Sequence, residues 1–286
     1  MRALDDFSRG SREYLQGLDV EILEADVRDE NAVRRAVEGV DTLVHLAAFG
    51  SVVESVQDPL PNFDVNVRGT LVGLHAAAAA GVSKVVFAST GGAIMGNAKP
   101  PVDESTLPWP ISPYGASKLC GEAYCHAFAG SFGLPVVALR FANVYGPVSA
   151  HKKGVITNFI RQAFRHEPLV VYGDGSATRD FMYVGDLCDG ICAAVAAPLQ
   201  DEVIHLASGE ETSIGRLAEL ILELTGAAGV PIHYEERRRG EVERTFARPD
   251  RAAELLGFAP SYTLAEGLEK TVGWFAEREQ APSSVG

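Results

Sequence analysis

The sequence contains few cysteines, and no set of side chains in it has the spacing of a metal site. Its four cysteines, Cys120, Cys125, Cys188 and Cys192, form no C-x-x-C pair, and no cluster of histidines adds ligands to them. We therefore predict that no metal is bound. We also expect all four to be buried free thiols in a reducing cytoplasm.

Basic charge and long apolar runs are scarce as well. Lys and Arg number 25 against 38 Asp and Glu, and the net charge of −13 argues against a general nucleic-acid binder. No apolar run approaches the roughly 20 residues that span a bilayer, and the first residues carry no signal-peptide pattern. These absences predict a cytoplasmic protein whose partners are neither nucleic acids nor membranes.

What is present favours an α/β protein. The 286 residues suffice for one large domain or two unequal ones. Apolar strands alternate with helical patterns through the first half, which predicts a doubly wound parallel sheet. After Gly146-Pro147 the elements become shorter and mixed. We therefore expect a sheet domain over 1–147 and a smaller, mixed α/β lobe over 148–278, from which some segments return to the first domain.

One stretch, S-P-Y-G-A-S-K at 112–118, carries a candidate acid–base pair. Ser112 and Pro113 suit the start of a helix, on which Tyr114 and Lys118 would lie one above the other. A cation about 4 Å from the phenol would lower its pKa from about 10 toward 7, where proton transfer works best. By spacing alone, a surface Tyr–Lys pair on an amphipathic helix remains the alternative.

Several motifs together resemble the extended short-chain dehydrogenase/reductase family, and within it the NAD-dependent nucleotide-sugar epimerases and dehydratases, most of all those of the UDP-glucose 4-epimerase type. The matching pieces cover nearly the whole chain and are VHLAA (44–48), ESVQDPL (54–60), NVRGT (66–70), FASTGGAIMG (87–96), SPYGASK (112–118), RFANVYGP (140–147), GDGSATRDFMYVGD (173–186) and RRRGE (237–241). The resemblance implies a Rossmann-type fold, a bound NAD and a homodimer formed through two helices, one of which carries Tyr114.

The resemblance also implies a set of cofactor residues. A carboxylate such as Asp5 after the second family strand would bind the adenosine ribose and favour NAD over NADP, and Asn66 would begin a helix that lines the site. Together with the acid–base pair, the residues expected to contact NAD are Asp5, Asp6, Asp26, Val27, Leu46, Ala47, Ala48, Asn66, Tyr114, Lys118 and Ala142.

The implied reaction is epimerisation of a UDP-hexose through a transient 4-keto sugar. Tyr114 would be the base, Lys118 would lower its pKa, and Ser89 and Thr90 occupy the place of the family's catalytic hydroxyl. The residues expected to bind substrate are Thr90, Asn143, Arg179, Arg238 and Glu241, the arginines acting as clamps on the nucleotide diphosphate.

One family feature is absent from these residues. No G-x-x-G-x-x-G occurs, although backbone N–H groups of that loop bind the pyrophosphate. We expect the chain to begin within the family's second strand, which leaves out the first strand and the loop. We favour the interpretation that the start of the chain is assigned too late over the interpretation that the protein itself is truncated. The product as it stands is then expected to be unstable and to lack copurifying NAD, because neighbouring strands lose backbone partners.

Three functions remain open at this stage. The first is epimerisation at C4. The second is a related dehydratase, decarboxylase or reductase of a nucleotide sugar; Gly91 and Gly92 stand where dehydratases carry an acid pair, which argues against dehydration. The third is a non-catalytic protein that binds a sugar nucleotide, favoured only by the missing glycine-rich loop.

Overall fold

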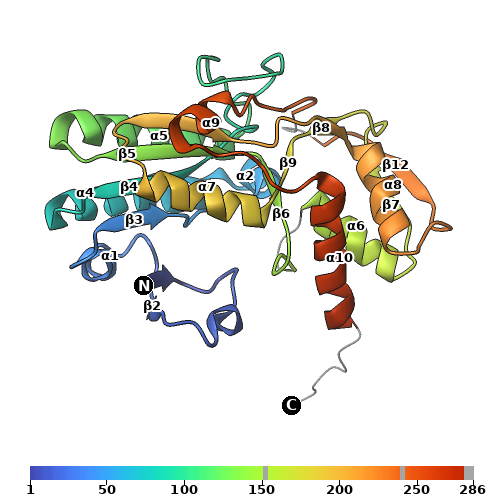
Figure 1. The fold of residues 1–286 in the computed structure, drawn as a ribbon, viewed down its shortest axis with the longest axis horizontal. Helices are drawn as coiled ribbons and strands as arrows, with labels where there is room; N and C mark the ends of the chain where they lie inside the picture. The colour runs from blue at the N-terminus through green and yellow to red at the C-terminus, as the bar shows by residue number, and fades with distance from the viewer. Residues whose placement is uncertain (151–153, 239–241, 280–286) are drawn as a thin grey trace.

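The computed structural model describes residues 1–150, 154–238 and 242–279 (Figure 1). Within them, strands and helices alternate along most of the chain. The strands are β1 (Arg2–Asp5), β2 (Glu21–Glu24), β3 (Thr42–His45), β4 (Lys84–Thr90), β5 (Val136–Phe141), β6 (Asn143–Tyr145), β7 (Leu169–Tyr172), β8 (Thr178–Arg179), β9 (Phe181–Tyr183), β10 (Glu202–Leu206), β11 (Thr212–Ser213) and β12 (Ile232–Glu235).

The helices vary from one turn to the five turns or more of α5. They are η1 (Arg12–Leu15), α1 (Glu30–Val37), α2 (Val52–Gln57), α3 (Pro59–Phe63), the π-helical η2 (Asp64–Arg68), α4 (Gly69–Ala80), α5 (Pro113–Phe132), α6 (Val155–Phe164), α7 (Val184–Ala196), α8 (Ile214–Leu224), α9 (Asp250–Leu256) and α10 (Leu264–Glu279).

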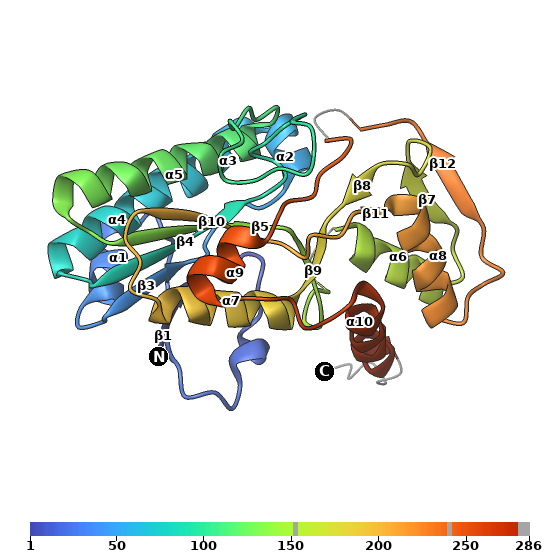
Figure 2. The same ribbon diagram turned by 45° about the horizontal axis from the view of Figure 1, so that its top comes forward.

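The largest sheet is parallel, with the order β10-β5-β4-β3, and helices cover both of its faces (Figure 2). Alternate residues of β4 and β5 face opposite ways, so that Phe87 packs with residues of α4 and α5 while Val86 packs with residues of α7 and α9. Such two-sided burial is typical of parallel sheets. The expected parallel α/β architecture is thereby confirmed.

Strands β1 and β2 form a separate parallel pair, and neither is hydrogen-bonded to the four-stranded sheet in the described residues. The expectation that the first strand is absent is not confirmed, because a strand forms at Arg2–Asp5. The Arg2 guanidinium donates to the carbonyls of Arg35, Ala36 and Glu38 at the end of α1, which ties the pair to that helix.

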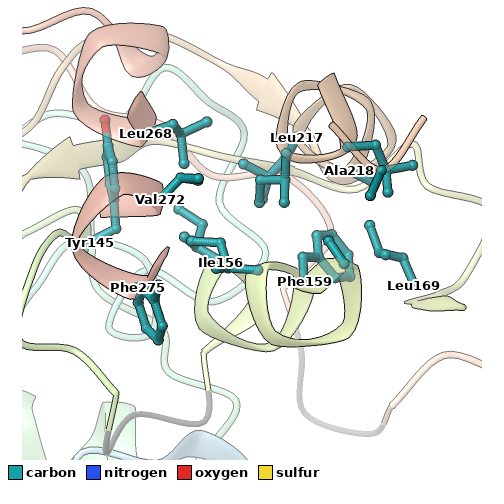
Figure 3. Packing of buried hydrophobic residues seen from close by; sticks show 14 of the residues in the cluster. Tyr145, Ile156, Phe159, Leu169, Leu217, Ala218, Leu268, Val272 and Phe275 are labelled. Carbon is teal, nitrogen blue, oxygen red and sulfur yellow. The ribbon is translucent and has the colours of Figure 1, made fainter. Parts of the chain in front are cut away.

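A second hydrophobic core lies where α6, α8 and α10 meet the β7–β12 pair. Figure 3 shows Ile156 and Phe159 of α6 directed toward Leu217 of α8 and Leu268 of α10. This part also holds the antiparallel β8–β11 pair, so its strands are mixed. In contrast, β10 lies later in the chain than α6 and returns to pair with β5 of the large sheet.

Several local expectations differ from the structure. Strand β3 covers only the first two residues of the V-H-L-A-A motif (44–48), because Leu46, Ala47 and Ala48 form part of a loop. Only Cys125 of the four free cysteines is buried, so the prediction of four buried thiols is wrong for Cys188 and Cys192, which are exposed, and for the half-buried Cys120. In the described ranges no helix has the length and apolarity to cross a membrane, and no group of acidic, histidine or cysteine side chains could hold a metal ion.

Candidate active site

The residues of S-P-Y-G-A-S-K form the first turns of α5, as predicted. Ser112 is the N-cap, and its hydroxyl accepts a hydrogen bond from the amide of Gly115 at 3.1 Å. The loop that follows β4 passes directly over this turn, because a Cβ at Gly115 would lie 2.2 Å from the Ala93 carbonyl oxygen. Glycine at 115 therefore allows the loop after β4 and the start of α5 to meet.

Tyr114 meets Thr90 at the carboxyl end of β4. The Thr90 hydroxyl acts to lower the pKa of the Tyr114 phenol, but burial outweighs this effect and raises that pKa to about 12. The phenol therefore keeps its proton at neutral pH in this structure. The spacing predicts a pKa near 7 for Tyr114, and this prediction does not hold in the structure.

Lys118 explains part of this difference. It is 3% exposed, its ammonium donates to the Ala88 carbonyl oxygen at 2.8 Å, and it lies 5.1 Å from the centre of the Phe87 ring. Lys118 is not among the groups that shift the pKa of Tyr114. Burial instead lowers the pKa of Lys118 itself to about 8, so that its charge is readily lost in weak base.

The loop that follows β3 is fastened beside α5 by two asparagines. The Asn66 side chain accepts from the Phe49 amide at 2.6 Å and donates to the Ser117 hydroxyl at 2.9 Å, and Asn62 donates to the Phe49 carbonyl. Asn66 lies inside η2, so the interpretation of it as the start of a helix is wrong. Its buried side chain holds Leu46, Ala47 and Ala48 in the loop at the sheet edge.

Two contacts at this edge were missed by the sequence analysis. The buried Ser55 hydroxyl accepts the Tyr114 amide at 3.1 Å, and Ser117 donates to the Tyr114 carbonyl at 2.8 Å. Ser117 could have been found from its place three residues after Tyr114 on the helix. Ser55 has no such signal, because it lies 59 residues earlier in the chain.

Ser89 points away from this group. Its hydroxyl donates to Glu122 at 2.6 Å beneath α5, and Glu122 is in turn paired with Arg140. Of the two hydroxyls predicted at this strand end, Thr90 is the one that lies at Tyr114. A catalytic role for Ser89 stays a prediction.

The residues expected at the adenosine end lie along the loops after β1 and β2. Asp5 accepts the Phe7 amide and Asp6 accepts the Ser8 amide, so both carboxylates stabilise the turn that follows β1. Arg28 donates to both oxygens of Asp26 and lowers its pKa. Val27 packs against Gly69, where a Cβ would approach it within 2.6 Å.

The residues expected to bind substrate are divided between two places. Asn143 starts β6 beside Ala142 at the end of β5, and donates to the Asp180 carbonyl. Arg179 donates to the carbonyls of Thr178 and Glu243.

The second place is a cavity of about 700 Å³ that Ser51, Glu54, Asn158 and Arg238 line. The exposed Arg238 lies 3.5 Å above the Tyr172 ring there. Glu241 falls outside the described residues.

The donors around Lys118 fit a polyhydroxylated ring such as a ribose. Its buried ammonium carries three hydrogens, and within the described residues it donates to the Ala88 carbonyl alone. A charged group this deeply buried is costly without further hydrogen-bond partners. The half-buried Ala47, Ala48 and Ala142 have small side chains that let a ligand come close to the backbone.

Comparison with known proteins adds the following. The family described as NAD dependent epimerase/dehydratase matches residues 2–213. A UDP-glucose 4-epimerase of Mycolicibacterium smegmatis is 35% identical over 285 residues, which cover 97% of this chain and 91% of that protein. The crystal structure of a UDP-glucose 4-epimerase from Thermotoga maritima with UDP-glucose has a TM-score of 0.93 and 34% identity, covering 98% of this chain and 91% of that one.

A UDP-glucose 4-epimerase from Thermus thermophilus in complex with NAD has a TM-score of 0.89 and 33% identity, covering 96% of this chain and 90% of that one. The similar proteins also include a UDP-N-acetyl-alpha-D-glucosaminuronate decarboxylase and a dTDP-glucose 4,6-dehydratase. The likeness thus extends to nucleotide-sugar enzymes that perform different reactions.

Proposed function

Because this chain belongs to the NAD-dependent epimerase/dehydratase family, we propose that it is a nucleotide-sugar epimerase that inverts C4 of a UDP-hexose. The observation that carries the proposal is that Thr90, at the carboxyl end of β4, lies at the buried phenol of Tyr114, one helical turn from the buried Lys118. Ligands of open parallel sheets bind at this edge. Relatives and solved structures named as UDP-glucose 4-epimerases support the same reaction.

In this proposal Tyr114 exchanges a proton with the C4 hydroxyl of the sugar. The Thr90 hydroxyl donates toward the phenol oxygen, and so stabilises the negative charge that forms there. The ammonium of Lys118, on the next turn of the helix, donates to the Ala88 carbonyl and would act on the cofactor rather than on the phenol. When bound, NAD would supply a reversible acceptor for the hydride of C4, the carbon that bears this hydroxyl.

NAD would be held by residues of three loops. Lys118 and Tyr114 would contact the nicotinamide ribose, and the small residues Ala47, Ala48 and Ala142 would let the cofactor approach the backbone. The side chains of Asn66 and Leu46 line the same edge. Asp5, Asp6, Asp26 and Val27 would form the adenosine end, where a carboxylate accepts ribose hydroxyls.

The nucleotide would lie between the sheet edge and the second core. Arg179 and Arg238 would bind the diphosphate, since a planar guanidinium meets two phosphate oxygens at once. Asn143 and Glu241 would contact the sugar and the nucleoside. This division makes 1–147 the cofactor part and 148–278 mainly the substrate part, with α7, β10 and α9 packed back on the large sheet.

A dehydratase, a decarboxylase or a reductase of a nucleotide sugar is the second candidate. Relatives of the first two kinds favour it. Gly91 and Gly92, which follow Thr90, carry no side chain that could remove a second proton from the sugar. This difference favours epimerisation over dehydration.

The decisive experiment incubates the protein with NAD and UDP-galactose and analyses the product by chromatography and mass spectrometry. Epimerisation gives UDP-glucose of unchanged mass, dehydration removes water, and decarboxylation, tested with UDP-glucuronate, removes carbon dioxide. Tyr114→Phe should lower kcat about 10²- to 10⁴-fold and leave binding of the nucleotide sugar intact. A non-catalytic binding protein would bind UDP-galactose and convert none of it, with or without Tyr114.

We also propose that the partner is a second copy of this chain, bound through α4 and α5. The outer face of α5 presents the exposed small residues Ala116, Ala123 and Ala127, and α4 presents His75 and Ala79. Small side chains allow helices of two copies to approach closely. Light scattering should give the mass of a dimer, and Ala123→Arg should give that of a monomer. A monomeric wild-type protein would contradict this proposal.

A further inference from the structure

Helix α5 carries a stripe of three polar residues at four-residue intervals, Tyr114, Lys118 and Glu122. Each of them meets β4 at one of three consecutive residues. Tyr114 meets the Thr90 side chain, Lys118 donates to the Ala88 carbonyl, and Glu122 accepts from the Ser89 hydroxyl. The first two contacts belong to the proposed reaction centre, whereas the third has no assigned role.

Glu122 lies over a row of polar side chains that crosses the sheet. Register pairs Ser89 of β4 with Arg140 of β5, and Arg140 with His205 of β10. All three are buried on the face that α5 covers. The row before it, Phe87, Ala138 and Val203, is apolar. A polar row in such a contact costs free energy unless its hydrogen bonds are made.

The hydrogen bonds of Ser89 and Arg140 converge on the Glu122 carboxylate, whereas the ring nitrogens of His205 have no partner in the described part of the chain. The carboxylate accepts from Ser89 Oγ at 2.6 Å, from Arg140 Nε at 2.9 Å and from Arg140 Nη2 at 2.8 Å, and both charged side chains are at most 7% exposed. A buried ion pair is weak evidence for stability, because apolar residues of similar volume often replace it without loss. The three hydrogen bonds instead fix where the Glu122 carboxylate lies over β4 and β5.

We propose that Glu122, held by Ser89 and Arg140, is a positioning residue that fixes the register of α5 along β4, so that Tyr114 and Lys118 lie at Thr90 and Ala88. The inference rests on the proposed function for its kinetic consequences only. The close contact of Gly121 with the Phe87 ring, where a Cβ would come within 2.4 Å, sets the spacing of helix and strand but leaves sliding along the strand open. The charged contact one residue later opposes that sliding.

Two substitutions remove this contact in different ways. Ser89→Ala deletes a single hydroxyl, so the fold is expected to survive even if Glu122→Gln, which leaves Arg140 without a charged partner, does not. The matched control is Phe128→Leu. Phe128 is buried on the same helix but lies ten residues beyond Lys118, about 15 Å along the axis, so its loss loosens α5 without touching the row.

The expected result is a fall in kcat of about tenfold or more for Ser89→Ala and Glu122→Gln with little change in KM, because small misplacements of catalytic groups are costly. Phe128→Leu, at an equal loss of thermal stability, should keep its kcat. The kcat of the double variant Ser89→Ala/Glu122→Gln should equal that of the slower single variant, since the two substitutions remove the same contact. Ser89→Thr, which retains the hydroxyl, should recover activity. Equal kcat values for Ser89→Ala, Glu122→Gln and the control Phe128→Leu would overturn the inference.

A second measurement does not depend on turnover. Hydrogen exchange at the first turns of α5, from Tyr114 to Lys118, should speed up in Ser89→Ala and stay unchanged in Phe128→Leu. If the wild-type protein converts no nucleotide sugar but this exchange pattern holds, the proposed function fails and the positioning role stands. If catalysis is found and exchange at Tyr114 is unaffected by Ser89→Ala, the positioning role is refuted; a kcat loss would then come from Ser89 acting directly.

Discussion

At the scale of single residues, burial and the Thr90 hydroxyl together set how easily the Tyr114 phenol can ionise. Burial alone raises the pKa of Tyr114, and the Thr90 hydroxyl opposes that rise. Both effects act on the charged phenolate. Burial removes the water that would stabilise it, so the phenolate depends on the few hydrogen-bond donors that the protein provides. Thr90 is therefore the side chain with the most direct influence on the acid–base step.

This predicts the behaviour of Thr90→Val, which keeps the shape and deletes the hydroxyl. We expect kcat to fall about 10²-fold or more, as for loss of a donor to a developing anion. The limb of the pH–rate profile that reports Tyr114 should move to higher pH, because the interaction that lowers the pKa is gone. Thr90→Ser serves as the control and should keep both values. An unshifted profile with normal kcat would show that Thr90 does not act on the phenol.

At the scale of elements, α5 is constrained at its beginning and free at its end. Gly115 touches the loop after β4, with a Cβ position only 2.2 Å from the Ala93 carbonyl oxygen, whereas Gly130 has nothing within 4 Å of its Cβ position. The same substitution on one helix should therefore have opposite effects. The difference arises from packing, since both residues are helical.

Gly115→Ala should destabilise the protein by about 1–3 kcal/mol, as overpacking does. Gly130→Ala should stabilise it by about 0.5–1 kcal/mol through helix propensity. Urea unfolding of both variants measures the two free energies. Similar values for the two substitutions would mean that the loop and the helix are not in contact at Gly115.

The β1–β2 pair is the element with the weakest support in the described structure. None of its residues is buried, and its strands pair only with each other. Its amides should therefore exchange with solvent by local opening, much faster than those of β4 and β5, whose interior residues are buried. Hydrogen-exchange mass spectrometry checks this directly. Protection of β1 equal to that of β4 would contradict the expectation.

At the scale of the whole molecule, two buried histidines on the same face of the large sheet link stability to pH. His45 of β3 and His205 of β10 are 6% and 0% exposed, and burial lowers the pKa of each to about 3. In the unfolded chain both have a pKa of about 6.5. The unfolded state thus binds more protons between pH 3 and 6.5, and the native state loses stability as the pH falls through that range.

Each histidine should contribute up to about 3 kcal/mol of this loss at pH 4. His45→Gln, which can still hydrogen-bond Thr70, should make the fall in stability between pH 6.5 and 4 less steep. His233, which is exposed and lies outside the proposed dimer face, provides the control, because His233→Gln should leave the slope unchanged. Urea midpoints measured from pH 4 to 7.5 give both slopes. An equal slope in wild type and His45→Gln would rule out this linkage.

The sequence by itself determined the alternation of strands and helices and the position of the acid–base pair on α5. Both follow from patterns within a few residues, such as the cap at Ser112 and the four-residue spacing of Tyr114 and Lys118. The bounds of α6, β7 and α8 also follow from local apolar periodicity. Motif order was enough to indicate the family.

Only the tertiary structure decided what surrounds these groups. Tyr114 has a raised pKa because it is buried, although the Thr90 hydroxyl acts to lower that pKa, and Lys118 donates to the Ala88 carbonyl. Ser89 and Thr90 are neighbours in sequence yet meet different parts of α5, because Ser89 donates to Glu122 in its middle and Thr90 lies at Tyr114 in its first turn. Electrostatics and burial depend on segments that meet only in the folded chain, and local spacing does not contain them.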